Sequence, residues 1–536
     1  MSRSSPSSLS PGPIIPARII IGVTGHRKLN NEPVLAEKVQ TILEKIKQLI
    51  GPLQNTPIAL NAVSSLAEGA DRLAVREILK TPGSQLDVIL PLEKDDYAQD
   101  FELPESREEF ERYLSQARRV KQIPPATGRA EAYARAGRYV VDNCDILIAI
   151  WDGQLAAGRG GTAEIVAYAR RKMCPLFWIN TGEDAKVAFE PGRDLSPRPY
   201  QDLDRYNSEP VDNRRIEEKA EGRHRFLLEQ AGRAQLPRDR LRAIRGLVLP
   251  HYSRADILAL RYQYLYFKAG SLVYILAAAA VAVAAFQALF LQDWPRIALI
   301  EVVFILAVLA VVWLGNRRKW HSKWIDYRFL AERFRSAQFM ALANVDVAAL
   351  RPPRHLSLSY SSQDWMVSAF SSMWRQLPRP HGFEPSEFEG LKKFTISAWI
   401  DDQILYHEKT SGRHGRRHQR MTLSGNILFG LTFVAAALHA LHLGAGVFDR
   451  IFLLMAIVLP AVASALSAIR THREYLRNAK RSHEMVRHLE EIREQMKAAQ
   501  DLESFLPLVR EAEETMLHEN ENWRIVVRFH ELEPPA

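Results

Sequence analysis

Residues 269–291, AGSLVYILAAAAVAVAAFQALFL, carry no charged side chain, and a second apolar run, IALIEVVFILAVLAVVWLG at 297–315, follows after a short turn. A helix needs about 20 apolar residues to cross the hydrocarbon core of a bilayer, so each run is long enough to span it. A second pair of such runs occupies residues 423–443 and 451–469. The sequence therefore predicts a membrane protein whose four spanning helices form two hairpins in the lipid bilayer.

Basic residues lie beside these runs and indicate an orientation. The links inside the two hairpins, residues 292–296 and 444–450, are short and close to neutral. Lys and Arg concentrate in the cytoplasmic flanks of membrane spans, so we expect both termini and the long middle segment in the cytoplasm. The net charge of +9 is then mostly a matter of topology, and no direct nucleic acid binding is expected. The flanking basic residues are Arg317, Arg318, Lys319, Lys323, Arg413, Arg416, Arg417, Arg420, Arg470, Arg473, Arg477, Lys480 and Arg481.

Only two cysteines, Cys144 and Cys174, are present, and both lie in apolar stretches. Two such thiols suit a reducing compartment, and they offer neither a disulfide framework nor a set of metal ligands. The sequence predicts that both cysteines pack in a core and that the chain has no metal site.

The amino-terminal third alternates short β-branched apolar runs with helical patterns. This alternation is typical of an α/β domain, a Rossmann-like, doubly wound parallel sheet with helices on both faces. The near-continuous Ile, Val and Leu content of the runs fits strands that are buried on both faces. The predicted strands are 18–24, 59–64, 85–90, 146–151 and 175–180, and the predicted helices lie near 32–50, 69–79, 107–119 and 162–171.

Three strand ends carry residues suited to a phosphorylated ligand. In open sheets of this type, ligands bind beyond the carboxyl ends of the strands. The first strand ends in GVTGHR at 22–27, where a glycine permits close backbone approach and His26 and Arg27 can donate hydrogen bonds to phosphate. Residues 64–72, SSLAEGADR, and 158–164, GRGGTAE, each lead into a helix whose free amides can hold an anion.

Each of these segments also has a purely structural explanation. A glycine after a strand is commonly only a turn, Thr162 is a suitable N-cap with Glu164 favourable to the helix dipole, and Asp71 and Arg72 are ordinary solvated helix charges. Neither a dinucleotide fingerprint nor a Walker A loop follows the first strand. The coincidence of three such segments on one sheet edge nevertheless favours a nucleotide site. Its candidate ligand-binding residues are Gly25, His26, Arg27, Ser65, Glu68, Gly69, Asp71, Arg72, Asp152, Gly160, Gly161, Thr162 and Glu164.

The motifs IGVTGHR at 21–27, SLAEGAD at 65–71 and GGTAE at 160–164 resemble the SLOG superfamily. These are Rossmann-like domains related to the LOG enzymes, DprA and the nucleotide-sensing domain of TRPM channels. The resemblance implies that Gly160, Gly161, Thr162 and Glu164 grip phosphate and ribose. The glycine turn is a compressed form of the family pattern, so it leaves open whether Glu164 acts in catalysis, as in the phosphoribohydrolases, or only in ribose binding.

The membrane half has a repeated layout. Each hairpin is preceded by an approach segment with aromatic residues and followed by a long basic helix, at 316–343 and 470–498. Residues 399–407, WIDDQILYH, resemble the SLATT family of two-span membrane modules that accompany SLOG domains in bacteria. The unit of helix, hairpin and basic helix is predicted to occur twice.

These patterns divide the chain into segments. The Ser/Pro-rich start is expected to be a disordered tail, and the regions flanking the first helical module are linkers without a confident regular element. The predicted segments are the tail at 1–16, the SLOG-like nucleotide-binding domain at 17–182, a linker at 183–250, the first helical module at 251–345, a linker at 346–395, the second helical module at 396–500 and a C-terminal segment at 501–536.

Taken together, the residues and the resemblances predict a nucleotide sensor joined to a membrane effector. The resemblances imply a bacterial inner-membrane protein of a conflict system such as anti-phage defence. The messenger would be an NAD-derived nucleotide of the ADP-ribose type or a cyclic nucleotide, made by an upstream enzyme, with no cofactor required. Any pore would form from several copies, as a homo-oligomer.

Two alternatives stay open. In the first, the chain is a membrane-anchored nucleotide N-glycosidase with Glu164 or Glu68 as the catalytic carboxylate. In the second, the spans form a transporter or a constitutive channel that needs no soluble ligand.

Overall fold

The computed structural model divides the chain into two compact units. The sheet unit comprises Ile14–Glu209 and Tyr360–Arg375, and the helical unit comprises Met1–Pro13, Pro210–Ser359 and Gln376–Ala536. The predicted disordered tail falls largely outside the described residues, although Ile15 is buried and its amide donates to Asn207 Oδ1. The structure describes residues 12–154, 160–182, 184–192, 196–343, 365–377, 385–444 and 446–527.

A seven-stranded sheet forms the centre of the sheet unit, in the order β4-β3-β2-β1-β5-β6-β7. The strands from β1 to β6 are parallel, and β7 is antiparallel to β6. The direction of winding reverses between β1 and β5, which is the switch point where such sheets bind ligands. The strands are β1 Ala17–Gly25, β2 Ile58–Ser64, β3 Gln85–Leu90, β4 Arg119–Gln122, β5 Ile146–Trp151, β6 Leu176–Asn180 and β7 Val187–Glu190.

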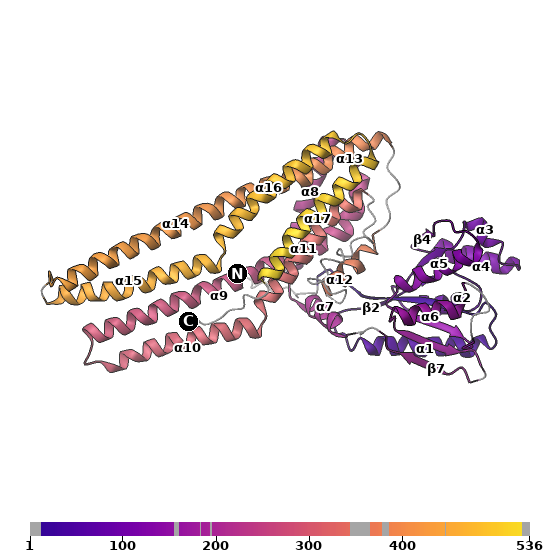
Figure 1. Cartoon of the computed structure of the whole chain (residues 1–536), viewed down its shortest axis with the longest axis horizontal. Helices are drawn as coiled ribbons and strands as arrows, with labels where there is room; N and C mark the ends of the chain where they lie inside the picture. Colours follow the sequence, from indigo (N-terminus) through magenta and orange to yellow (C-terminus); the bar gives the residue numbers. More distant parts are fainter. Residues whose placement is uncertain are drawn as a thin grey trace, which may run out of the picture. The chain divides into compact units, whose positions relative to one another are not determined.

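Helices cover both faces of this sheet. One core contains the apolar stripes of α1, α2 and α4, and a second core contains those of α5 and α6. All six residues of β5 are buried, as expected for a strand covered on both faces. The predicted Rossmann-like, doubly wound sheet is therefore confirmed (Figure 1). The helices are α1 Glu32–Leu49, α2 Ala70–Leu79, α3 Lys94–Ala98, α4 Pro104–Gln116, α5 Arg129–Asp142, α6 Thr162–Arg171 and α7 Arg198–Ser208.

The sequence missed β4, α3 and α5, and the predicted linker at 183–250 contains β7, α7 and α8 (Asn213–Ala234). The predicted helix at 107–119 has the right length but lies three residues too far along the chain, because α4 runs from Pro104 to Gln116, Ala117 is extended and Arg119 already begins β4. Both missed strands are four-residue edge strands, and β4 reads RVKQ, which is too short and too charged to show an apolar run.

A helix from the predicted linker at 346–395 belongs to the sheet unit. This helix, α12 at Trp365–Trp374, packs against α7, with the rings of Trp365 and Tyr206 5.3 Å apart. The hydroxyl of Ser372 donates to Pro16 O at 2.6 Å, and Arg18 Nε donates to Ser372 O at 3.2 Å. The segment between the two hairpins thus completes the sheet unit at the start of β1.

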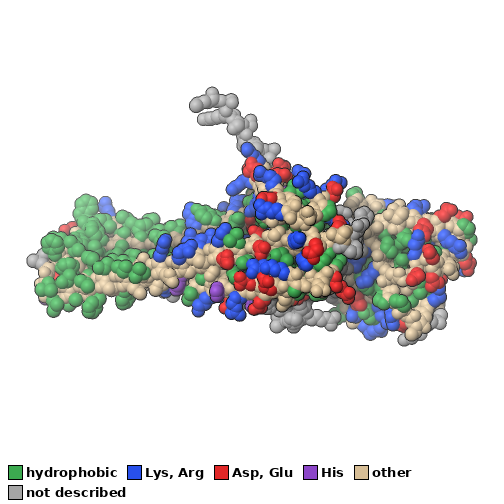
Figure 2. Space-filling view, turned by 90° about the horizontal axis from the view of Figure 1, so that it is seen from above, with side chains coloured by type: hydrophobic (Ala, Val, Ile, Leu, Met, Phe, Trp, Pro, Cys, Tyr) green, Lys and Arg blue, Asp and Glu red, His purple; other side chains and the backbone are tan. Residues whose placement is uncertain are grey.

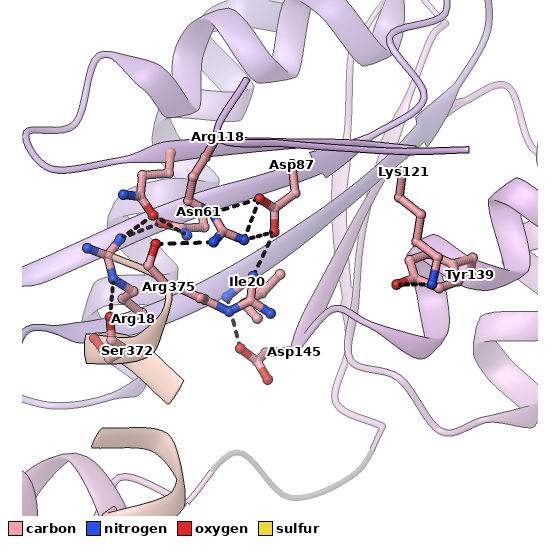
Figure 3. Close-up of polar contacts among 11 residues, drawn as sticks. Arg18, Ile20, Asn61, Asp87, Arg118, Lys121, Tyr139, Asp145, Ser372 and Arg375 are labelled. Atoms are coloured by element: carbon pink, nitrogen blue, oxygen red, sulfur yellow. Dashed lines mark hydrogen bonds and ion pairs between the residues drawn. The ribbon is translucent and has the colours of Figure 1, made fainter. Parts of the chain in front are cut away.

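A buried ionic cluster lies at the same end of the sheet (Figure 3). Asp87 at the start of β3 accepts from Arg118 Nε at 3.0 Å and from Arg375 Nη1 at 2.7 Å. Arg18 Nη1 donates to Asn61 Oδ1 at 2.9 Å, and burial lowers the pKa of Arg18 to about 10. We call Arg18, Asp87, Arg118 and Arg375 the Asp87 cluster. It joins β1, β3, the start of β4 and the segment after α12 at the amino ends of the strands, the end opposite to the predicted ligand edge.

The helical unit contains the two hairpins. Four helices, α9, α10, α14 and α15, are long and apolar enough to cross a membrane, and they contain the four predicted spans except for one to three residues at span ends, the largest difference being that α14 ends at Ala440. The remaining helices are polar and pack at the ends of these spans. The bounds are α8 Asn213–Ala234, α9 Leu249–Phe290, α10 Ala298–Arg317, α11 Trp320–Leu342, α13 Phe388–Thr395, α14 Asp401–Ala440, α15 Val447–His472, α16 Tyr475–Ala498 and α17 Leu502–Val527.

The two helical modules share one layout. A single π-helical turn, at Ile244–Val248 or Ile396–Ile400, precedes a helix of 42 or 40 residues. After the second span a residue in the left-handed conformation, Lys319 or Glu474, starts a helix of 23 or 24 residues. The first module therefore repeats the second in local backbone as well as in order.

The apolar surface of the hairpins is left uncovered by the protein. Only 6% of the most apolar window is buried in α10, α14 and α15, and 17% in α9. Hydrophobic side chains cover the hairpin end of the helical unit, and Lys and Arg begin where that surface ends (Figure 2). Side chains such as Phe433, 74% exposed, need a lipid surrounding. The chain is a multi-pass membrane protein.

The Asp87 cluster gives a first prediction. Asp87→Ala leaves Arg118 and Arg375 without their carboxylate, which we expect to destabilise the sheet unit by about 3 kcal/mol. For a unit of this size that loss lowers the midpoint of thermal unfolding by roughly 6–12 °C. Thermal scans of the full chain in detergent measure it. The control is Glu44→Ala, because Glu44 forms an exposed ion pair with Lys47. Equal shifts in the two variants would show that the cluster does not hold α12 to the sheet.

Candidate functional site

The loops after β1, β2 and β5 meet at the switch point of the sheet. The amide of His26 donates to Ile150 O at 3.0 Å, and the amide of Ala70 donates to His26 O at 3.0 Å. A Cβ on Gly25 would lie 2.3 Å from Ala70 Cβ, and a Cβ on Gly69 would lie 2.3 Å from Arg27 O. Gly69 also has φ +71°. Both positions require glycine because the loops approach each other so closely.

His26 and Asp152 form the contact between the first and third loops. The amide of Asp152 donates to His26 Nε2 at 3.2 Å, and Asp152 Oδ1 lies 3.2 Å from the same nitrogen. The amide of Gln154 and then His26 hold the pKa of Asp152 below its usual range. Both side chains keep more than a third of their surface exposed. The pair thus offers an accessible imidazole and carboxylate at the rim.

Arg27 points toward the segment between α3 and α4 and toward α5. Its Nη2 lies 3.6 Å from Asp100 Oδ2, and its guanidinium carbon lies 5.6 Å from the ring centre of Tyr133. Asp100 is shared, because Arg129 Nη2 donates to it at 2.6 Å and the Tyr133 hydroxyl donates to its other oxygen. Arg27 remains 44% exposed, so it can turn toward an anion.

The predicted residues of the second loop are mostly engaged by the protein. Ser64 Oγ donates to Asp71 Oδ2 at 2.6 Å, and burial raises the pKa of Asp71 to about 6, against the hydrogen bonds from Ser64 and the amides of Ala67 and Ser65. Asp71 therefore holds the turn in place. It is buried, so the interpretation of Asp71 as a solvated helix charge is wrong.

Arg72 and Glu68 contact the start of α4. Arg72 is buried, donates to Leu66 O at 3.1 Å and to Ser106 O at 2.9 Å, and lies 4.5 Å from the ring centre of Phe101. Arg72 is therefore not a solvated charge either. Ser106 Oγ donates to Glu68 Oε1. These contacts fix the second loop against α4.

The glycine turn before α6 is held by Glu164. The amide of Gly160 donates to Glu164 Oε2 at 2.8 Å, and Arg138 Nη2 donates to Oε1 at 2.8 Å. The helix begins at Thr162 with Gly161 as its N-cap, so the interpretation of Thr162 as the cap is wrong. Gly158 of the predicted motif lies outside the described residues.

Tyr133 connects this turn to the first loop. Gly160 has φ +84°, and a Cβ there would lie 2.7 Å from Ala130 O and 3.1 Å from Tyr133 Cβ. Tyr133 also faces Arg27, so the three predicted loops and the start of α5 share one rim. Sequence reasoning missed Asp100, Arg129 and Tyr133. Arg129 and Tyr133 are spaced i and i+4, so they lie on one face of α5. That spacing is informative only if a helix is expected there, and α5 was not predicted because the edge strand before it shows no apolar run.

Comparison with known proteins concerns the second helical module. Residues 396–523 match the family model of SMODS and SLOG-associating 2TM effector domain 1, SLATT_1. The match begins at the π-helical turn before α14 and covers α15, α16 and most of α17. No relative among curated proteins matches the chain. The expected SLATT module is confirmed at these residues, whereas the SLOG assignment of the sheet unit stays a prediction.

The raised pKa of Asp71 gives a prediction on pH. The pKa is about 6 in the folded chain and 3.8 in the reference state, so between those values the folded chain holds a proton that the unfolded chain has lost. Stability contributed by this group therefore falls as pH rises through that window, by up to about 3 kcal/mol. The side chain of Asp71→Asn is neutral throughout. The unfolding midpoint of this variant, relative to that of the native chain, should therefore rise between pH 4 and pH 7.

Thermal scans at several pH values test this difference. The control is Asp184→Asn, since Asp184 is exposed and pairs only with the exposed Lys186 among the described residues. A gap between Asp71→Asn and the native chain that stays constant with pH would contradict the assignment.

Proposed function

We propose that this chain is a membrane effector switched by a small phosphorylated nucleotide that binds the sheet unit. The observation that carries the proposal is the match of residues 396–523 to a two-span effector domain that associates with sensor domains. The same chain also contains a sheet unit whose loops converge at the switch point. A sensor and an effector on one chain account for both features.

The rim offers the groups that a nucleotide needs. The exposed His26 and Arg27 supply donors for phosphate, and the start of α6 at Gly161 supplies free amides and a favourable dipole. Asp152 and Glu164 supply carboxylates for ribose hydroxyls. Glu164 is already bonded to Arg138 and Gly160, so ligand binding there would exchange one hydrogen bond for another. An ADP-ribose type nucleotide or a cyclic nucleotide fits this set.

The route of the chain couples the two units. It leaves the sheet unit after Glu209, forms the first helical module, and returns for Tyr360–Arg375 before the second module begins. A shift of α12 therefore acts on the polypeptide between the two modules. Coupling between such sites is typically about 1–3 kcal/mol, which changes an equilibrium by about 5–150-fold. Several copies would assemble to perturb the membrane, as expected of a defence system.

Permeabilisation of vesicles tests the proposal. We expect the full chain in dye-loaded vesicles to release dye on addition of ADP-ribose, its cyclic isomers or cyclic dinucleotides. Arg27→Gln removes one phosphate donor and should raise the concentration for half-maximal release by about tenfold. The control is Arg198→Gln, because Arg198 is an 80% exposed residue on α7.

Three other outcomes would contradict the proposal. If none of these nucleotides causes dye release, the chain is not a sensor of them. Release of a free base from NAD or a nucleoside monophosphate would favour the N-glycosidase, with Glu164 or Glu68 as the catalytic carboxylate. Dye release without any nucleotide would favour a constitutive channel.

Cysteine labelling tests the proposed orientation. The native Cys144 and Cys174 are buried, so the native chain should stay unlabelled by a membrane-impermeant maleimide. Asp293→Cys, in the first hairpin link, should react in intact cells, whereas Gln500→Cys, before α17, should react only after permeabilisation. The reverse pattern would place both termini outside.

A further inference from the structure

The helical unit contains a large cavity where the spans meet the polar helices. Its volume is about 1190 Å³, and its walls come from α9, α11, α14, α15 and α16, with Met516 of α17. Gly270 and Ser467 line it near the ends of their spans, and Arg413 and Arg417 line it just before the third span. The cavity therefore lies at the membrane boundary, at the end of the spans that carries the basic residues.

Both helical modules contribute to this cavity. Helices α9 and α11 belong to the first module, and α14, α15 and α16 belong to the second. The modules touch at its wall, since a Cβ on Gly270 would lie 2.1 Å from His472 Nε2. The rings of Tyr266 and His472 lie 4.9 Å apart. A ligand in the cavity would thus contact both modules at once.

The charge of the lining is strongly positive. Six arginines line the cavity against three carboxylates, and the three histidines of the lining are not needed for this excess of positive charge. Two of the carboxylates are already paired with arginines of the lining. Glu332 lies 2.5 Å from Arg328 Nη2 and 2.8 Å from Arg335 Nη1, and Asp256 lies 3.5 Å from Arg328 Nη1 and also pairs with Lys219. Glu474, the third, lies 3.2 Å from Arg477 Nη1.

These pairs leave donors in the cavity without a carboxylate. Within the part of the chain that the structure describes, Arg413 and Arg417 have no acidic partner. Among the acceptors that the structure describes, Arg473 donates to neutral oxygens alone, Phe267 O at 3.3 Å and Ser271 Oγ at 3.1 Å. The buried Nε of Arg473 and Nδ1 of His414 have no hydrogen-bond partner among the described residues. A buried polar group without a partner is destabilising, and a bound phosphate oxygen would satisfy such a donor.

We propose that this cavity binds a phosphate group, held between Arg413 and Arg417 on one helix and Arg473 on the facing wall. Arginine matches the geometry of phosphate oxygens with paired hydrogen bonds. The phosphate belongs either to the headgroup of an anionic phospholipid, which basic pockets between spans bind, or to a free phosphorylated solute, because arginine forms the same hydrogen bonds with the phosphate oxygens of both. The proposal does not depend on the nucleotide site of the sheet unit.

The consequence is a second control point on the effector. Arg413, Arg417 and Arg473 all belong to the second module, and Arg473 also donates to Phe267 O and Ser271 Oγ of the first module. Bound phosphate screens the repulsion among these arginines and holds Arg473 at that contact, so it favours the arrangement in which the two modules are packed together. Loss of the phosphate would favour their separation.

Binding to two probes tests the inference on the purified full chain. Native mass spectrometry counts retained phosphatidylglycerol, with phosphatidylcholine as the neutral comparison, and calorimetry measures pyrophosphate. We expect Arg413→Gln/Arg417→Gln to lower the affinity for whichever probe binds the native chain by about tenfold or more. The matched control is Arg416→Gln/Arg420→Gln, the same charge change on the same helix at positions outside the lining.

The outcomes separate the sources. Loss of phosphatidylglycerol in the cavity variant alone identifies a lipid, and loss of pyrophosphate alone identifies a free solute. If the double variant fails to fold, as judged by its elution and unfolding midpoint, the single exposed substitution Arg417→Gln replaces it. Absence of binding of both probes to the native chain, or equal losses in the cavity and control variants, overturns the proposal.

Discussion

The uncovered apolar surface of four helices constrains the rest of this protein. Helices whose apolar windows are only 6–17% buried must lie in lipid, where every backbone amide has to be satisfied inside its own helix. The polar helices and the basic residues are therefore confined to the ends of the spans. The positive lining of the cavity in the helical unit follows in part from that confinement, since Arg413, Arg417, Arg473 and Arg481 flank the spans of the second module and meet Arg328 and Arg335 of α11 there.

The sheet unit obeys a different constraint, close backbone approach at its switch point. Gly25 and Gly69 permit contacts that any side chain would block, and Gly160 does the same against the start of α5. Most charged side chains of the second loop form contacts within the protein that hold the loops in place, whereas His26, Arg27 and Asp152 remain accessible. At the opposite end of the strands the Asp87 cluster attaches α12, so one sheet carries both a rim suited to a ligand and an attachment to the chain between the hairpins.

Elements with an apolar run of their own could be predicted from the sequence, whereas short edge strands and contacts between residues far apart in the sequence could not. The four spans and five of the seven strands were predictable, because each shows an apolar run of its own. The edge strand β4 has no such run, and without it α5 and Tyr133 could not be placed at the rim. The membership of α12 in the sheet unit depends on ion pairs between residues almost 290 positions apart, such as Asp87 and Arg375, which no local pattern reveals. The ligand roles of the rim residues stay predictions.

The most direct test is hydrogen exchange of the full chain in lipid, with and without one of the nucleotides used in the vesicle experiment. It measures whether binding at the rim changes the helical modules. The account predicts slower exchange at residues 25–27 and 160–164 together with changed exchange in α12 and in the helical modules. Slower exchange at the rim with no change in the helical modules would contradict it.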